Sequence, residues 1–336
     1  MGKESSRESM NINEIARLAG VSRATVSRYL NDGYVSEEKK QAIRTVIEKT
    51  GYEPSQQARN LRSKVTKLIG VIIPRIQSEA VSRMVAGISE VLSKQGYQLL
   101  LANTDNNTKE ELKYLRIFRK NQVDGIIFMG TMFSKEHLKE MQEVDVPIVV
   151  AAQELDNYSC VYQDDYHAAC KATEALLVHG KAYGYIGVTA KDKAVGGARK
   201  KGFLDTLQKA GIKIKKTGMY ETEFRIQGGY DKAKELMEAQ PDTDSIFCAT
   251  DSLAVGALRY LHERKIAVPQ QVQLVGFGDT ELGSMVSPAI TSVRFHYKTT
   301  GIEAAKLLLE ILQTDTDMKK QIKMGFELVE KASIRS

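Results

Sequence analysis

The sequence predicts an α/β protein with a small all-helical N-terminal part and a large domain of doubly wound parallel sheets. The chain has 336 residues, which is too many for one ordinary compact domain. Apolar residues recur at helical spacing before Lys67, whereas short apolar runs alternate with amphipathic segments after it. These observations predict at least two folding units.

The composition is that of a globular protein, with 42% hydrophobic and 27% charged residues. No apolar run approaches the roughly 18 residues that span a bilayer, and the N-terminus lacks the apolar segment of a signal peptide, so we expect a cytoplasmic location. Cys160, Cys170 and Cys248 lack metal-ligand spacing, so we expect buried free thiols and no metal.

Positive charge is concentrated near the N-terminus. Of the net charge of +6, most comes from the segment between Met10 and Lys67, which has eleven Lys or Arg against six Asp or Glu. Residues 1–9 are balanced, and we expect residues 1–10 to be a disordered leader. A basic segment can form a nucleic-acid-binding surface or an ordinary solvent-exposed surface. The sequence motif of the segment is therefore needed to distinguish the two interpretations.

The first helices predict a helix-turn-helix over residues 11–54. Asn11 can cap a helix that ends at Gly20, and Ser22 can cap a second helix over Arg23–Leu30. A third helix from Ser36 to Gly51 would close the small core. The second helix exposes short polar and basic side chains that suit base edges and phosphates, although an ordinary helical hairpin could expose them too.

The ordered motif makes the DNA-binding interpretation much more specific. It reads Ile-x-x-Ile-Ala-x-Leu-Ala-Gly-Val-Ser-x-x-Thr-Val-Ser-Arg, followed by Gly51-Tyr52-x-Pro54 and Ala58-Arg59-x-Leu61. From Met10 onward the chain resembles the lactose-repressor (LacI/GalR) family. The resemblance implies that these residues contact DNA: Ser22, Arg23, Ala24, Thr25, Ser27, Arg28 and Asn31. It also implies a hinge over residues 55–66, with a hinge helix at Ser55–Arg62 and Leu61 as a minor-groove wedge.

Residues 67–336 show the alternation of strands and helices that is typical of doubly wound sheets. Strands are predicted at Leu68–Ile73, Tyr97–Ala102, Gly125–Met129, Ile148–Ala152, Tyr183–Val188, Ser245–Ala249 and Val272–Gly276. Helices are predicted at Ala80–Lys94, Lys109–Lys120, Tyr166–His179, Arg199–Ala210, Gly228–Ala239 and Ser252–Lys265.

The resemblance implies two lobes like those of periplasmic binding proteins, with three chain crossings near Asp164, near Arg294 and toward the C-terminus. The expected N-lobe comprises about 67–164 and 295–320, and the C-lobe about 165–294 and 321–336. The resemblance also implies a homodimer formed through this domain, and the sequence leaves a tetramer open.

Ligands of such sheets bind beyond the carboxyl ends of the strands. The polar residues expected there are Arg75, Asp192, Arg199, Thr250, Asp251, Asp279 and Tyr297. For each one alone, a helix cap or a surface charge is an equally good interpretation. The resemblance matches Arg199 and Asp251 to effector-binding positions, whereas Thr250 and Gly278 differ from the Asn and Asp of many members.

Several pocket segments, among them Pro74-Arg75 and Asp192 to Arg199, resemble trehalose repressors. This similarity predicts a repressor of a carbohydrate-utilisation operon that a sugar phosphate, trehalose 6-phosphate or sucrose 6-phosphate, releases from its operator. Arg75 and Arg199 would bind the phosphate, because guanidinium groups contact phosphate oxygens in pairs. Induction is expected, although corepression stays open.

Other function classes remain alternatives. A free sugar or a phosphocarrier protein could be the signal, and a non-regulatory sugar-binding protein would share the bilobed fold. An enzyme is not expected, because nucleotide-binding, zinc-protease and serine-hydrolase motifs are missing and the five histidines are scattered. We therefore expect no catalytic residue and no cofactor.

Overall fold

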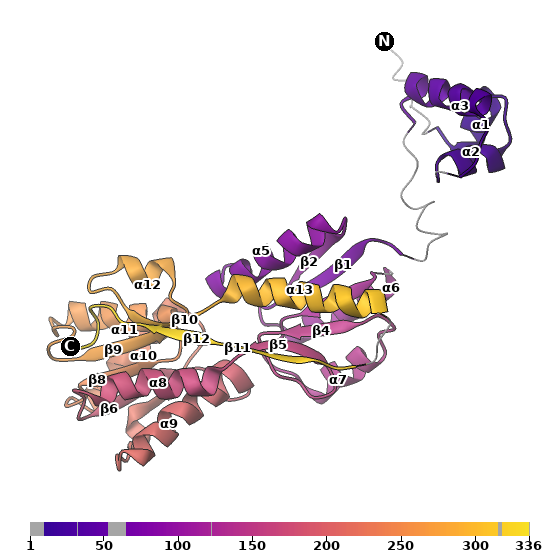
Figure 1. The fold of residues 1–336 in the computed structure, drawn as a ribbon. Coiled ribbons are helices and arrows are strands. Elements are labelled where there is room, and N and C mark those ends of the chain that lie inside the picture. The colour runs from indigo at the N-terminus through magenta and orange to yellow at the C-terminus, as the bar shows by residue number, and fades with distance from the viewer. Residues whose placement is uncertain (1–9, 32, 53–64, 122, 315–317, 336) are drawn as a thin grey trace, which may run out of the picture. The chain divides into compact units, whose positions relative to one another are not determined.

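The computed structural model describes residues 10–31, 33–52, 65–121, 123–314 and 318–335. The chain divides into two compact units, residues 1–66 and 67–336, which Figure 1 shows as a small helical headpiece and a large α/β domain.

The headpiece is a three-helix unit in which caps fix the helix ends. Its helices are α1 (Ile12–Leu18), α2 (Arg23–Tyr29) and α3 (Glu37–Thr50). The side chain of Asn11 caps α1 in a capping box with Glu14, and Gly51 ends α3 in the left-handed conformation with φ 63°. Ile15, Val26 and Ile43 are fully buried where the three helices meet, so the predicted helix-turn-helix is confirmed.

The large domain contains two six-stranded sheets, which confirms the predicted fold class. The first has the order β11-β5-β4-β3-β1-β2, and every neighbouring pair is parallel. Its strands are β1 (Leu68–Ile73), β2 (Gln98–Asn103), β3 (Gly125–Phe128), β4 (Ile148–Ala151), β5 (Ser159–Gln163) and β11 (Gln321–Met324).

The second sheet has the order β12-β10-β9-β8-β6-β7, and it is parallel except for β12, which runs antiparallel to β10. Its strands are β6 (Tyr183–Gly187), β7 (Met219–Glu221), β8 (Ser245–Cys248), β9 (Gln273–Phe277), β10 (Thr291–Phe295) and β12 (Phe326–Val329). Where strands and helices of the large domain were predicted, their bounds are correct to within two residues.

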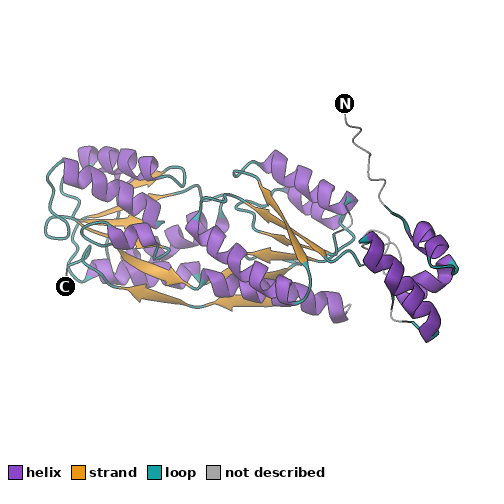
Figure 2. Cartoon of the chain, turned by 90° about the horizontal axis from the view of Figure 1, so that it is seen from above, coloured by secondary structure: helices purple, strands orange, loops and turns teal. Residues whose placement is uncertain are grey.

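Helices cover both faces of each sheet (Figure 2). On the first sheet, α5 (Glu79–Lys94) and α13 (Tyr297–Thr314) share one face, and α6 (Thr108–Lys120) and α7 (Lys135–Gln142) share the other. On the second sheet, α8 (Asp165–Leu177) and α9 (Arg199–Lys209) lie opposite α10 (Ile226–Ala239) and α11 (Asp251–Glu263). The short α12 (Glu281–Met285) follows β9.

The chain passes between the two sheets three times. It crosses from β5 into α8 at Asp164, from β10 into α13 at His296, and from β11 to β12 at Gly325. The third crossing lies after β11, because β11 pairs with β5 of the first sheet. The predicted lobe boundary at residues 320 and 321 is therefore too early, and residues 321–324 belong to the first lobe.

Two glycines let α5 and α13 pack closely. A Cβ at Gly301 would lie 2.0 Å from the backbone oxygen of Met84, and a Cβ at Gly87 would lie 2.1 Å from that of Lys298. We expect Gly301→Ala to destabilise the large domain by about 1–3 kcal/mol, since backbone must move to admit the methyl group. Urea unfolding checks this, and Gly325→Ala, which meets no atom within 4 Å, is the control. Equal stability of the two variants would contradict the packing argument.

No helix in the described ranges is long and apolar enough to cross a membrane. The three cysteines are free thiols; Cys160 and Cys248 are buried, whereas Cys170 is only partly buried, so the expectation of burial is wrong for that residue.

Candidate functional site

The predicted DNA-contacting side chains lie on and beside α2. Ser22 caps the helix by accepting a hydrogen bond from the backbone N–H of Thr25 at 3.2 Å. Arg23, Ala24 and Arg28 are exposed, and in the described headpiece neither arginine has an acidic partner within ion-pair distance. The polar and basic surface of α2 is therefore available to a ligand.

The flanks of α2 are more constrained. Asn31 is exposed and donates through Nδ2 to the backbone oxygen of Ser27 at 2.6 Å, whereas Thr25 and Ser27 are half-buried. The proposed hinge helix at 55–62, with Leu61, lies outside the described residues.

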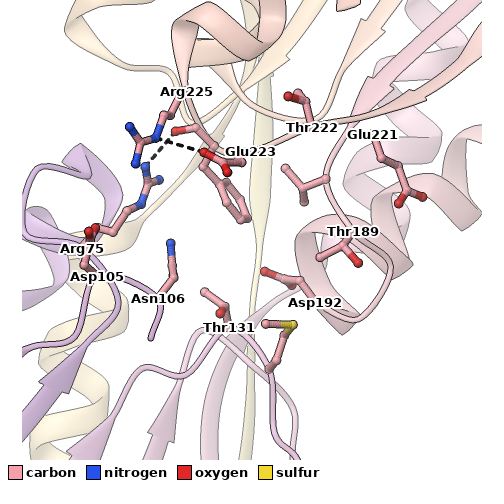
Figure 3. A pocket seen from close by; sticks show the side chains of 13 residues that line it. Arg75, Asp105, Asn106, Thr131, Thr189, Asp192, Glu221, Thr222, Glu223 and Arg225 are labelled. Atoms are coloured by element: carbon pink, nitrogen blue, oxygen red, sulfur yellow. Dashed lines mark hydrogen bonds and ion pairs between the residues drawn. The ribbon is translucent and has the colours of Figure 1, made fainter. Parts of the chain in front are cut away.

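The large domain has a cavity of about 540 Å³ between its two lobes (Figure 3). Its lining residues are Arg75, Asp105, Asn106, Thr131, Met132, Val188, Thr189, Asp192, Glu221, Thr222, Glu223, Phe224 and Arg225. They follow β1, β2 and β3 of the first lobe and β6 and β7 of the second. In each sheet the winding reverses beside β1 or β6, which is where doubly wound sheets bind ligands. The volume is within the range of small-molecule sites.

Two arginines form one end of this pocket (Figure 3). Arg75 donates from Nη1 to the backbone oxygen of Phe224 at 2.8 Å, and its guanidinium lies 5.3 Å from the centre of the Phe224 ring. Burial lowers the pKa of Arg75; the carboxylate of Asp105 opposes this change, and the positive charge of Arg225 adds to it. The two cations therefore repel each other at this end of the pocket, and an anion bound beside them would relieve that repulsion.

The acidic lining residues are mostly engaged by partners of their own. Glu223 lies 3.2 Å from Nε of Arg225, and Glu221 accepts from Nζ of Lys200 at 2.8 Å. Asp192 is 2% exposed and accepts at Oδ1 from the backbone N–H groups of Ala194 and Val195, at 3.1 and 2.9 Å. Arg75 and Arg225 are thus the cationic groups that line the pocket, and an anion bound there would compete with Glu223 for Arg225.

Acceptors for ligand hydroxyl groups lie deeper in the pocket. Oδ1 of Asn106 is buried and has no hydrogen-bond partner in the described structure. Asp105 and Asn106 adopt positive φ values of 50° and 58°, which Asp and Asn tolerate better than most residues, in the turn that follows β2. A buried acceptor without a donor costs free energy, so a ligand that donates a hydrogen bond would satisfy it.

Of the seven effector-binding residues predicted from the sequence, Arg75 and Asp192 line this pocket and five do not. Arg199 is 3% exposed; its Nε donates to Oδ1 of Asp165 at 2.7 Å and its Nη1 to the backbone oxygen of Ala249 at 2.6 Å. Its guanidinium also faces the rings of Phe277 and Phe295, at 4.7 and 5.1 Å. Arg199 therefore joins α8, the end of β8 and the rings on β9 and β10 within the second lobe.

The remaining predicted residues also make contacts within the protein. Thr250 caps α11 by accepting from the N–H of Leu253 at 3.3 Å. Asp251 is 1% exposed and accepts from the N–H of Thr280 at 2.7 Å and the hydroxyl of Ser292 at 2.6 Å. Hydrogen bonds within the protein thus occupy both Thr250 and Asp251.

Asp279 and Tyr297 lie beside the same crossings. Asp279 is ion-paired with Nε of Arg294 at 2.7 Å and Nζ of Lys331 at 2.6 Å. Tyr297 is buried at the start of α13, and its burial raises the pKa of its hydroxyl to about 12.

Sequence reasoning missed the pocket segments at 105–106, 131–132 and 221–225. The first two follow predicted strands and could have been considered on position alone. The segment after β7 could not, because β7 has three residues and gives no strand pattern.

Comparisons with known proteins agree with both units. Residues 11–55 match the model of bacterial regulatory proteins of the lacI family. Residues 66–332 match the model of periplasmic binding proteins and the sugar-binding domain of the LacI family. The second match covers well over half of the chain.

Among curated relatives, the chain is 35% identical to the sucrose operon repressor of Staphylococcus xylosus, over 90% of this chain and 94% of the relative. It is 31% identical to catabolite control protein A of Priestia megaterium, over 91% and 94%. The names of both relatives describe regulatory proteins and not enzymes.

Solved structures show the same architecture. The transcriptional regulator CelR in complex with cellobiose is 25% identical with a TM-score of 0.75, and the match covers 96% of this chain and 99% of that one. The lac repressor dimer bound to operator, at 18% identity and a TM-score of 0.87 over 98% and 100%, supports the fold alone. The chain belongs to the LacI family of bacterial DNA-binding transcriptional regulators.

Proposed function

We propose that this protein represses a carbohydrate-utilisation operon and that a phosphorylated sugar, bound in the pocket between the lobes, releases it from its operator. The observation that carries the effector class is the pair of guanidinium groups of Arg75 and Arg225 at one end of the pocket. Guanidinium groups bind phosphate oxygens through paired, charge-assisted hydrogen bonds. Arg225 replaces Arg199 as the second phosphate-binding arginine, because Asp165 already engages Arg199.

The rest of the pocket suits the sugar itself. Asn106 offers an unpaired buried acceptor, and Asp192, which accepts from Gln153, Ala194 and Val195 at Oδ1, lines the same pocket. Thr131, Thr189 and Thr222 add hydroxyl or backbone groups along the wall. A molecule with a phosphate at one end and donor hydroxyls at the other would satisfy both.

Sucrose 6-phosphate and trehalose 6-phosphate are the two candidate effectors. The similarity to the sucrose operon repressor supports the first, and the resemblance of the segments around Arg75 and Asp192 to trehalose repressors supports the second. Both are disaccharide phosphates, so the same arrangement of charge and hydroxyl acceptors serves either one.

The DNA-binding surface in this proposal is the exposed side of α2, with Ser22, Arg23, Ala24, Thr25, Ser27, Arg28 and Asn31 toward the major groove. Leu61 is proposed as the minor-groove wedge, and a homodimer would hold two half-sites of a palindromic operator.

Arg75 suggests how the effector could act. Its bond to the backbone oxygen of Phe224 joins the two lobes directly, so a phosphate that competes for Arg75 changes a contact between them. A typical allosteric coupling of about 1–3 kcal/mol would then lower operator affinity by roughly 5–150-fold.

We expect Arg23→Ala to weaken binding to the operator by roughly 5–150-fold, because a bidentate contact between arginine and a guanine edge would be lost. Fluorescence anisotropy with a labelled operator at constant salt measures the effect. Arg44→Ala is the matched control, since Arg44 is an exposed arginine of α3 that lies 3.8 Å from Glu48. If both variants lost the same operator affinity, the loss would reflect net charge alone. Arg23 would then not be a base-contacting residue.

Calorimetric titration of the purified protein with both disaccharide phosphates and the corresponding free sugars tests the effector class. Tight binding of one phosphate ester, with much weaker binding of its free sugar, is expected. Equal binding of ester and free sugar would overturn the assignment of a phosphate site to the two arginines.

A further inference from the structure

A buried amide joins the two lobes beneath the pocket. Gln153 follows β4 of the first lobe, is 5% exposed and does not line the cavity. Its Nε2 donates to the backbone oxygen of Thr131 at 3.1 Å and to Oδ1 of Asp192, in the second lobe, at 2.8 Å. Both partners are acceptors, so the amide nitrogen must face them. Both partners line the pocket.

The Asp192 carboxylate depends on these donors. Burial raises its pKa, and the hydrogen bonds from the N–H of Val195 and from Gln153 oppose that change. The charged groups that face it are Arg199, which favours the ionised form, and Asp165, which disfavours it. Gln153 is thus a neutral donor that supports an ionised carboxylate at the floor of the pocket.

We propose that Gln153 is a positioning residue for the effector: it sets the separation of the lobes at the pocket floor and keeps Asp192 oriented to accept a ligand hydroxyl. The inference rests on the proposed function, since it takes the pocket to be the sugar site. Gln153 would act without touching the ligand, through an amide that contacts lining residues of both lobes.

Loss of the amide has two physical consequences. The backbone oxygen of Thr131 and Oδ1 of Asp192 each lose one donor, and the free energy of the ionised carboxylate rises more than that of the neutral acid. The contact that bridges the lobes at this point also disappears. Both changes lower the affinity for a ligand that donates a hydrogen bond to Asp192. The loss of a donor to the Asp192 carboxylate also makes this decrease in affinity depend on pH.

Gln153→Met tests the proposal, because methionine has a similar length and no donor. We expect its affinity for the disaccharide phosphate at pH 7 to fall about tenfold, the usual effect of losing a hydrogen bond to a charged group. A ligand hydroxyl needs the ionised carboxylate, so affinity is lost as pH falls through the pKa of Asp192. In the variant that pKa is higher, and the loss should begin at a higher pH than in the wild type.

Gln163→Met is the matched control. Gln163 is another buried glutamine of the first lobe, and its Nε2 donates to the hydroxyl of Thr300 at 2.8 Å, away from Asp192. Gln163→Met should lower the free energy of unfolding but leave the pH dependence of ligand affinity unchanged. The phosphate group of the ligand titrates alike in all variants, so differences between profiles report on the protein.

Wild-type affinity in Gln153→Met, or a loss of equal size at every pH, would overturn the proposal. If no sugar binds the wild type, the proposed function fails first, and the carboxyl NMR titration of Asp192, assigned by comparison with Asp192→Asn, still decides the role of Gln153. A higher titration midpoint in Gln153→Met supports the role, and an unchanged midpoint rejects it.

Discussion

Replacing Arg225 by alanine is expected to weaken binding of the disaccharide phosphate by roughly 10–150-fold and to leave binding of the free sugar nearly unchanged. Arg225 lies at the arginine end of the pocket, where its charge acts on Arg75, and its side chain is 67% exposed. Because it is exposed, its removal should leave the fold intact. Calorimetric titration of each ligand measures the two affinities.

Two further variants sharpen this prediction. Arg225→Lys keeps the charge but loses the planar fork, so an intermediate affinity is expected. Arg259→Ala removes an exposed arginine that pairs with Glu263 at 3.0 Å outside the pocket, and it should change neither affinity. If Arg225→Ala weakened the ester and the free sugar equally, Arg225 would not be a phosphate ligand.

Replacing Arg199 by methionine is expected to destabilise the large domain by about 3–5 kcal/mol, because it leaves the Asp165 carboxylate buried without its partner. Burial lowers the pKa of Arg199, but the nearby Asp165, Tyr297 and Asp192 together more than offset burial and hold that pKa above its ordinary value. Urea unfolding at pH 7 measures the loss.

The pH dependence of that loss has a definite sign. Burial raises the pKa of Asp165, and without Arg199 the folded-state pKa rises further above the unfolded value. A group with a raised folded-state pKa favours the folded state at low pH and loses that contribution as pH rises. The deficit of Arg199→Met should therefore be smaller at pH 5 than at pH 7.

The double variant Arg199→Met with Asp165→Leu separates the ion pair from packing. Removing both charges should recover most of the lost stability, because no unpaired charge then remains buried. A double variant as unstable as the single one would instead assign the loss to the contacts of Arg199 with Phe277 and Phe295.

Local patterns carried most of the fold prediction. Caps such as Asn11 and Ser22 and the left-handed glycine at Gly51 act within one turn of a helix, so the sequence alone reveals them. The strands missed in the second lobe include the three-residue β7 and the partly exposed β12, which give no clear pattern. The long helix α13 was also missed, although its apolar residues have helical spacing.

The pocket was harder to predict than the sheets. Several strands end in polar residues, but only the strands beside the point where the strand order reverses contribute to the pocket wall. Asp251 and Asp279 follow β8 and β9, whereas the second-lobe pocket wall follows β6 and β7. Which strands form the wall depends on how the lobes meet. The engagement of Arg199 by Asp165, 34 positions earlier in the chain, likewise arises only in the folded lobe.

In this mechanism a sugar phosphate controls DNA binding. The decisive measurement titrates the purified protein with a palindromic operator of the family type at fixed salt, with and without each disaccharide phosphate and each free sugar. We predict that one phosphate ester alone lowers operator affinity. Arg225→Ala should shift this response to a roughly 10–150-fold higher concentration of the ester, while operator binding without ligand is unchanged. Operator binding that no sugar phosphate alters would contradict the claim.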